Sequence, residues 1–231
     1  MQILAMDTAT SACSVALWQD GAITHHRFVA MVRGQAEALA PMIADVLDEA
    51  DVSAHALDLL AVTVGPGAFT GLRIGLATAR AMSLAADVPC LGLTTTEVIA
   101  HAMDDASLPD GSLLVALDSK RSDIYVQTFS CDRLALRDAQ AIEPATLGPW
   151  LKGTPGPIRI IGDAAGLAHS ALQETGVSAI QLEGVDVPDA AVMAALAAKR
   201  WSPKDPTPAP TPLYLRPADA KLPRNGGRLR P

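Results

Sequence analysis

The sequence is poor in aromatic residues, cysteine and long apolar runs. Only eight of its 231 residues are Phe, Trp or Tyr, and its three cysteines lie far apart without a CxxC pair. This spacing argues against a disulfide framework or a cysteine-built zinc site. No apolar run approaches the roughly 20 residues that a membrane helix needs, and residues 1–7 lack the basic start of a signal peptide. We therefore expect a cytoplasmic protein with free thiols and no membrane segment.

Basic residues are also scarce. The chain has 18 Lys and Arg against 25 Asp and Glu, a formal charge of −7. Residues 203–231 carry a net +4, so the first 202 residues carry −11. Proteins that bind nucleic acid on their own gain affinity by neutralising phosphates with Lys and Arg. Contact with nucleic acid is thus expected only through the tail or through a partner.

Alanine is abundant, with 42 residues, which favours helices packed closely through small side chains. Hydrophobic periodicity predicts three strands followed by α-β-α-β-α, once in each half of the chain. In the first half, strands are predicted at 2–6, 13–19, 22–29, 57–64 and 89–93, and helices at 39–50, 70–86 and 94–104. In the second half, strands are predicted at 113–117, 124–129, 134–142, 158–161 and 178–182, and helices at 144–151, 166–175 and 190–201.

This repeated order predicts a duplicated ribonuclease-H-like α/β fold, the architecture of actin, Hsp70 and sugar kinases. The turn-rich segment at 108–112 separates an N-terminal module, 1–107, from a second module, 108–202. The tail, 203–231, holds eight of the 17 prolines and is expected to be extended. We predict that it straps back on the body through Leu213 to Arg216 and that its last residues, 225–231, are mobile.

Two aspartates occupy equivalent places in the two modules. Asp7, followed by Thr8, and Asp118 each end a first strand, and ligands of open α/β sheets bind at the carboxyl ends of strands. An aspartate there can equally hydrogen-bond its own turn. Both interpretations, a ligand-binding carboxylate and a turn-forming one, stay open.

The segment from Gly65 to Gly75 is a glycine-rich strand-to-helix turn. Such turns can hold phosphate, which makes Gly65 and Gly67 candidates, but the spacing is GxGxxxG and no GK[ST] follows. Alternatively, Gly71, Gly75 and Ala79 form a strip without bulk, suited to a closely packed helix or sheet. The neighbour could belong to this chain or to another subunit.

Signatures of catalysis and metal binding are missing from the sequence. The five histidines form no HxxxH or HExxH pair, and there is no GxSxG and no Cys/His arrangement. We therefore predict no catalytic residue and no metal site in this chain.

Four segments nevertheless resemble one family. MQILAMDTATSACSVALWQDG, VGPGAFTGLRIGLATARAMSLAADVPCLGLTTTE, LDSKRSDIYV and PLYLRP are similar to the TsaB (YeaZ) family, and the resemblance covers nearly the whole chain. It implies a non-catalytic, activating subunit in the synthesis of threonylcarbamoyladenosine (t6A) in tRNA. Its implied partners are the paralogue TsaD, which carries the metal and transfers the group, and the ATPase TsaE. ATP and Mg would then be used through the partners, and tRNA would be bound through the complex.

The resemblance also implies where partners bind. TsaB pairs with TsaD through the first two helices of its N-terminal module and can form a homodimer through similar surfaces. On this chain, the matching interface residues would be Leu39, Met42, Gly71, Leu72, Gly75 and Ala79. Many members have His where this chain has Gln35. The alternatives are a nucleotide-binding ATPase or kinase of the actin-like fold, supported by Asp7, Asp118 and the glycine-rich turn, and an M22-type glycoprotease.

Overall fold

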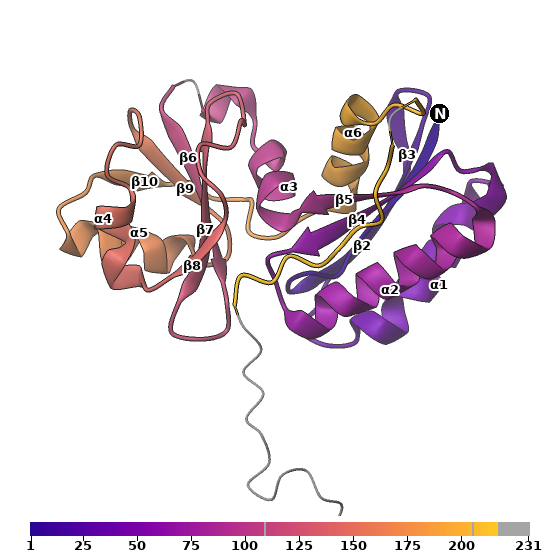
Figure 1. The fold of residues 1–231 in the computed structure, drawn as a ribbon, viewed down its shortest axis with the longest axis horizontal. Coiled ribbons are helices and arrows are strands. Elements are labelled where there is room, and N and C mark those ends of the chain that lie inside the picture. The colour runs from indigo at the N-terminus through magenta and orange to yellow at the C-terminus, as the bar shows by residue number, and fades with distance from the viewer. Residues whose placement is uncertain (109, 205, 217–231) are drawn as a thin grey trace, which may run out of the picture.

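The computed structural model describes residues 1–108, 110–204 and 206–216. It shows two α/β lobes side by side, with helix α3 (Thr95–Ala102) between them and the C-terminal segment crossing both (Figure 1). Each lobe is built on one five-stranded mixed sheet.

The first sheet comprises β1 (Gln2–Asp7), β2 (Ala12–Gln19), β3 (Ala22–Ala30), β4 (Leu59–Gly65) and β5 (Cys90–Thr94). Its strand order is β3-β2-β1-β4-β5; β1 runs antiparallel to β2 and parallel to β4. Two long helices connect these strands, α1 (Gln35–Glu49) and α2 (Phe69–Ala86). A 3-10 turn, Ala54–Ala56, precedes β4.

The second sheet comprises β6 (Ser112–Asp118), β7 (Ile124–Ser130), β8 (Gln140–Ile142), β9 (Ile158–Ile161) and β10 (Ala179–Gln181). Its order, β10-β9-β6-β7-β8, repeats that of the first sheet. The helices are α4 (Leu147–Trp150), α5 (Ala165–Glu174) and α6 (Ala190–Arg200), with 3-10 turns at Asp105–Ser107 and Pro144–Thr146. The predicted duplicated ribonuclease-H-like fold is confirmed.

Alternation along the central strands builds one core on each face of a sheet. On β1, Leu4 and Met6 pack with α1 and α2, whereas Ile3 and Ala5 face the other way. Successive side chains of a strand point to opposite faces, so a strand buried on both sides is apolar throughout. The run Gln2 to Met6 was predicted to be a strand for this reason.

The opposite face of the first sheet is covered by a helix from the far end of the chain. Met193 and Ala197 of α6 lie in the same apolar cluster as Ile3 and Ala5. Helix α3 contributes to both lobes, because Val98 joins this cluster and Ile99 joins the core of the second sheet. A boundary at 107/108 separates the two sheets, but not the helices that cover them. Helix α6, which the sequence assigned to the second module, packs on the sheet of the first lobe.

Most elements begin and end within three residues of their predicted bounds, and two differ more. Helix α1 begins at Gln35 rather than at residue 39 and continues through Pro41, which lies on its exposed side. The predicted strand at 134–142 is shorter, because only Gln140–Ile142 pairs along β7, and a single bridge joins Ala135 to Phe129. Leu134 and Leu136 are both exposed, so this stretch places neither leucine in the core.

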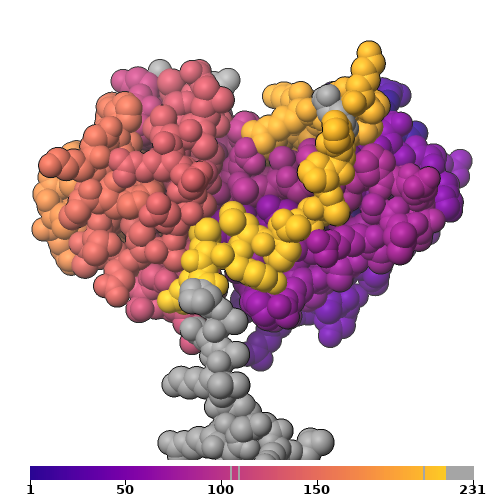
Figure 2. Space-filling model, viewed as in Figure 1, coloured from indigo at the N-terminus to yellow at the C-terminus, as the bar shows by residue number. Residues whose placement is uncertain are grey.

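The described part of the tail forms a strap over the body (Figure 2). The amide of Leu213 donates to the carbonyl of Val64 (2.7 Å), and the Arg80 guanidinium donates to the Pro210 carbonyl (2.6 Å). Arg216 then pairs with Asp123 of the second lobe, with 2.7 Å between Nε and Oδ2. The strap therefore contacts both lobes; the segment 225–231, predicted to be mobile, lies outside the described residues.

Candidate functional site

The two strand-end aspartates lie at equivalent places and form equivalent turns. The Ala9 amide donates to Oδ1 of Asp7 (3.1 Å), and the Lys120 amide donates to Oδ1 of Asp118 (2.6 Å). In both lobes the carboxylate thus accepts the N–H two residues further on, which defines an Asx turn. Of the two interpretations left open by the sequence, the structure shows the turn-forming one.

The surroundings of the two carboxylates differ. Asp7 is fully buried, and its Oδ1 accepts the Thr63 hydroxyl at 2.5 Å. Its Oδ2 has no hydrogen-bond partner among the described residues. Burial raises the pKa of Asp7 to about 7, because the charged form loses its hydration and the hydrogen bonds only partly compensate. A ligand cannot reach this carboxylate in the observed conformation.

Asp118 is accessible, with 41% of its side chain exposed, and the Lys120 ammonium lies 2.8 Å from its Oδ2. Partial burial acts to raise the pKa of Asp118, but the hydrogen bonds and charge of Lys120 outweigh it and lower the pKa. The Asp118 amide also donates to Asp163 (2.8 Å), and burial raises the pKa of that neighbouring carboxyl.

The glycine strip of α2 faces the turn after β1. A Cβ on Gly67 or Gly71 would overlap the carbonyl oxygens of Ala9 and Thr8, and one on Gly75 would lie 2.8 Å from the Thr8 hydroxyl oxygen. That hydroxyl donates to the Gly71 carbonyl at 2.7 Å. The missing side chains let the β1–β2 turn pack on the start of α2. The strip therefore serves packing within the chain.

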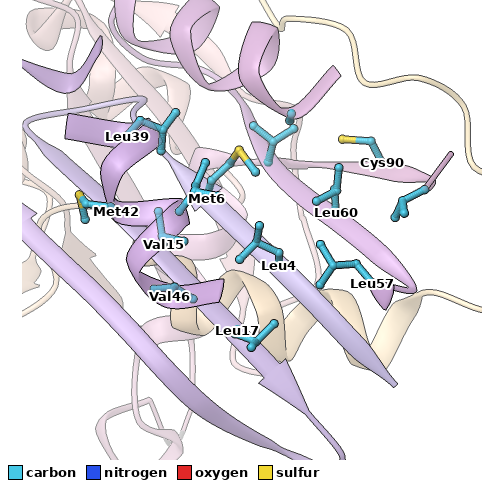
Figure 3. Packing of buried hydrophobic residues seen from close by; sticks show 14 of the residues in the cluster. Leu4, Met6, Val15, Leu17, Leu39, Met42, Val46, Leu57, Leu60 and Cys90 are labelled. Carbon is cyan, nitrogen blue, oxygen red and sulfur yellow. The ribbon is translucent and has the colours of Figure 1, made fainter. Parts of the chain in front are cut away.

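The structure thus corrects the predicted partner interface. Leu39 and Met42 are only 1% and 8% exposed and lie in the core between α1 and the sheet (Figure 3). Leu72 and Ala79 of α2 are likewise buried. None of these side chains, nor the glycine strip, presents a surface for another subunit. A leucine at Gly75 would disturb the fold itself.

Gly65 has a role at the strap. Its φ of +114° is one that residues with a side chain rarely adopt, and a Cβ there would lie 2.9 Å from the Leu213 carbonyl oxygen. Gly65 thus lets the tail pack against the end of β4.

A cavity of about 540 Å³ lies between the lobes at the candidate residues. Its charged lining residues are Arg33, Glu37, Asp118, Lys120 and Asp163. Gln35 also lines it and donates to the carbonyls of Met31 (3.2 Å) and Thr10 (3.3 Å). With three carboxylates against two cations, the cavity offers little attraction to a phosphate.

A second cavity, about 700 Å³, adjoins the first and was not predicted. It is lined by the start of α2, the β6–β7 turn and the strap. The residues come from three distant segments, so no local pattern could reveal it. The available signals were the neighbouring Tyr and Arg of LYLR and the two adjacent basic residues of DSKR.

Across the described ranges, no three His, Cys, Asp or Glu side chains come together as a group that could hold a metal ion. Among the helices of the same ranges, none has the length and apolarity to cross a membrane.

The repeated strand order and the cleft between the lobes place the chain in the class of duplicated ribonuclease-H-like proteins. Residues 30–152 match the model of the family TsaD, tRNA N6-adenosine threonylcarbamoyltransferase. The tRNA threonylcarbamoyladenosine biosynthesis protein TsaB of Escherichia coli is 36% identical over 64% of this chain. An uncharacterized protein of Mycobacterium tuberculosis is 31% identical over 95% of this chain and 93% of its own length.

A solved structure from Pseudomonas aeruginosa, described as similar to the peptidase YeaZ, superposes with a TM-score of 0.78. It is 25% identical and covers 93% of this chain and 99% of its own. The chain belongs to the TsaB (YeaZ) family, as the sequence motifs predicted. The matched region spans 63% of the length of the E. coli relative.

Proposed function

We propose that this chain is a non-catalytic, activating subunit in the synthesis of threonylcarbamoyladenosine (t6A) in tRNA. It would pair with a TsaD-type transferase and work with a TsaE-type ATPase in the cytoplasm. The observation that carries the proposal is its family membership, because the E. coli relative is named for this pathway.

The geometry of the strand-end aspartates supports a non-catalytic role. In the cleft of a nucleotide-dependent enzyme, carboxylates should reach the ligand or its metal. Here Asp7 is sealed inside the first lobe, and Asp118 is paired with Lys120. We propose that this chain alone binds no cofactor and that ATP and Mg act through the partners. Calorimetry with ATP and magnesium tests this, and micromolar binding by the isolated chain would favour an ATPase or kinase instead.

We propose the exposed face of α1 and α2 as the partner surface, in place of the buried strip. Both helices cover the same face of the first sheet (Figure 1). Their solvent side is rich in alanine, and Leu84 of α2 is 87% exposed. The exposed small apolar residues are Ala36, Ala40 and Ala44 on α1, and Ala77, Ala81 and Ala85 on α2. Small residues allow two helices to approach closely.

The family match suggests the occupant of this face. The TsaD-type model aligns over residues 30–152, which include α1 and α2. A partner with the same two helices can pair with them about a pseudo-twofold axis, as identical subunits do in a symmetric dimer. The same surface would allow a homodimer when the partner is absent.

Reconstitution tests the function, and a matched pair of variants tests the surface. Omitting this chain from a mixture of TsaD-type and TsaE-type proteins, tRNA and threonylcarbamoyl-adenylate should abolish or strongly reduce modification. Full multi-turnover activity without it would contradict the proposal. Leu84→Glu should weaken capture of the TsaD-type protein about tenfold or more, because it places a charge in an apolar contact.

Leu167→Glu is the control, since Leu167 is exposed on α5 of the second lobe. It should leave capture unchanged. Equal capture by wild type and both variants would move the interface away from α1 and α2. Sedimentation of the isolated chain shows whether Leu84→Glu also removes a homodimer.

A further inference from the structure

The larger cavity differs in charge from the rest of the molecule. Four of its lining residues are cations, and no described lining residue is acidic, although the chain has more acidic than basic residues. The cations are Arg73 of α2, Lys120 and Arg121 of the β6–β7 turn, and Arg216 of the strap. Such a gathering in an acidic protein indicates an anionic ligand.

Neighbouring carboxylates pair with two of these cations, and Arg73 has a different environment. Lys120 pairs with Asp118 and Arg216 with Asp123. Arg73 instead contacts two neutral rings: its Nε donates to the Tyr214 hydroxyl (3.0 Å), and its guanidinium carbon lies 3.7 Å from the Phe69 ring centroid. Arg73 therefore brings to the cavity a positive charge that its two ring contacts do not neutralise.

Aromatic rings gather at the same cavity. Both tyrosines of the chain, Tyr125 and Tyr214, line it together with Phe69. Phe69 and Tyr214 are 52% and 43% exposed, and their ring centroids are 5.4 Å apart. Exposed rings beside guanidinium groups are the surface on which nucleobases stack while their phosphates are neutralised.

The positive charge continues along the sequence. The strap brings Arg216 to the cavity, and the next 15 residues contain Lys221, Arg224, Arg228 and Arg230 against Asp219 alone. A mononucleotide carries its phosphates in one group, whereas a strand of nucleic acid carries one phosphate per nucleotide and can neutralise many cations. The distribution of charge thus favours a polyanion.

We propose that this cavity binds a single-stranded segment of RNA, with phosphates near Arg73, Lys120 and Arg121 and a base against Phe69 and Tyr214. The inference rests on the proposed function, in which the RNA is the tRNA presented to the transferase. It gives this chain a direct RNA contact at one place, although its acidic body leaves other contacts to partners.

The experiment uses the full chain and an unstructured, labelled RNA of about 12 nucleotides, with binding followed by fluorescence anisotropy between roughly 50 and 200 mM salt. Arg73→Gln and Arg121→Gln should each weaken binding at least threefold. Each should also reduce the slope of log affinity against log salt by about 0.7, the value for one phosphate contact on a single strand. Phe69→Ala should weaken binding about fivefold or more through lost stacking.

Arg27→Gln is the matched control, because Arg27 pairs with Glu49 on the first lobe and is not part of the cavity. It should bind within twofold of wild type. Arg121→Gln changes an exposed residue of the β6–β7 turn, so the variant replaces a residue outside the strap. A thermal melt confirms that each variant is folded.

Three results would overturn the inference: no binding by the wild type, pocket variants that bind like the wild type, or displacement of the RNA by an equal concentration of ATP. The last would assign the cavity to a mononucleotide. Capture of the TsaD-type protein is measured on the same variants. Intact capture with unaltered RNA binding would refute the RNA site and leave the proposed function in place.

Discussion

The turns after β1 and β6 form one motif in two environments. Each begins with an aspartate that accepts the amide two residues on. In the first lobe, the α2 glycines let the helix close over the turn, so that Asp7 is buried and its pKa rises to about 7. In the second lobe, Asp118 stays accessible, and Lys120 lowers its pKa. The same aspartate turn therefore holds a buried carboxyl group in the first lobe and a solvent-exposed ion pair in the second.

The largest expected effect concerns Asp7 and pH. Its pKa is raised above the unfolded value of 3.8, so the folded state binds the extra proton between about pH 4 and 7. Wild-type stability should fall as pH rises through that interval and level off above it. The loss is on the order of 4 kcal/mol for about three pKa units.

Asp7→Asn should flatten this dependence, because the amide keeps an oxygen for Thr63 and Ala9 but never ionises. Urea denaturation of both proteins at pH 4 and pH 8 gives the comparison. If the difference in stability between variant and wild type were the same at both pH values, Asp7 would be ionised in the folded protein. The contrast with Asp118 would then disappear.

The second prediction concerns α2 and α5, which follow the equivalent strands β4 and β9 of the two lobes. Gly71→Ala should cost about 1–3 kcal/mol, because the new methyl group meets the Thr8 backbone. Gly166→Ala on α5 is its counterpart: the nearest atom to the added Cβ is 3.8 Å away, so up to about 1 kcal/mol of helix propensity should be gained. Opposite signs in thermal melts would support the difference in packing, and equal effects would contradict it.

The smallest effect is expected for Asp118→Asn. Because the pKa of Asp118 is lowered in the folded state, its ionised form stabilises the fold above about pH 4. This stabilisation is lost as the pH falls. Because the ion pair with Lys120 is exposed, the variant should lose less than about 1 kcal/mol at neutral pH, and this loss should shrink as the pH falls below about 4. A loss of several kcal/mol in urea titrations at pH 7 would mean that Asp118 does more than hold its own turn.

Much of the fold could be predicted because each strand and helix carries its own periodicity. Residues 3–6 are an unbroken apolar run, which is typical of a strand buried on both faces. What covers each face is a long-range property: nothing near residues 190–200 indicates that α6 packs on β1 rather than on its own sheet. The prediction of a strand over 134–142 was wrong for residues 134–139. The leucines there match a strand pattern but are exposed in the structure.

The candidate site was predicted in part. The equivalence of Asp7 and Asp118 follows from strand order, and so does the position of the glycine-rich turn. Periodicity gives the buried stripe of a helix but not what buries it. The family resemblance placed Leu39 and Met42 at a partner interface, but they pack on the chain's own sheet. The neighbour of the glycine strip, left open by the sequence, is the turn after β1. The cationic cavity depends on Arg73, Lys120 and Arg216 meeting across the fold, which spacing cannot show.

The sharing of helices between the lobes limits how the cleft can open. Helix α3 leaves β5 of the first sheet yet places Ile99 in the core of the second, while α6 returns from the second sheet to cover the first. Arg200 of α6 also pairs with Glu97 of α3 (2.6 Å). A simple hinge requires a connection whose backbone can turn freely. In this chain, relative motion must instead slide two packed helices past each other, so any ligand or partner that shifts the lobes does so by small shear displacements.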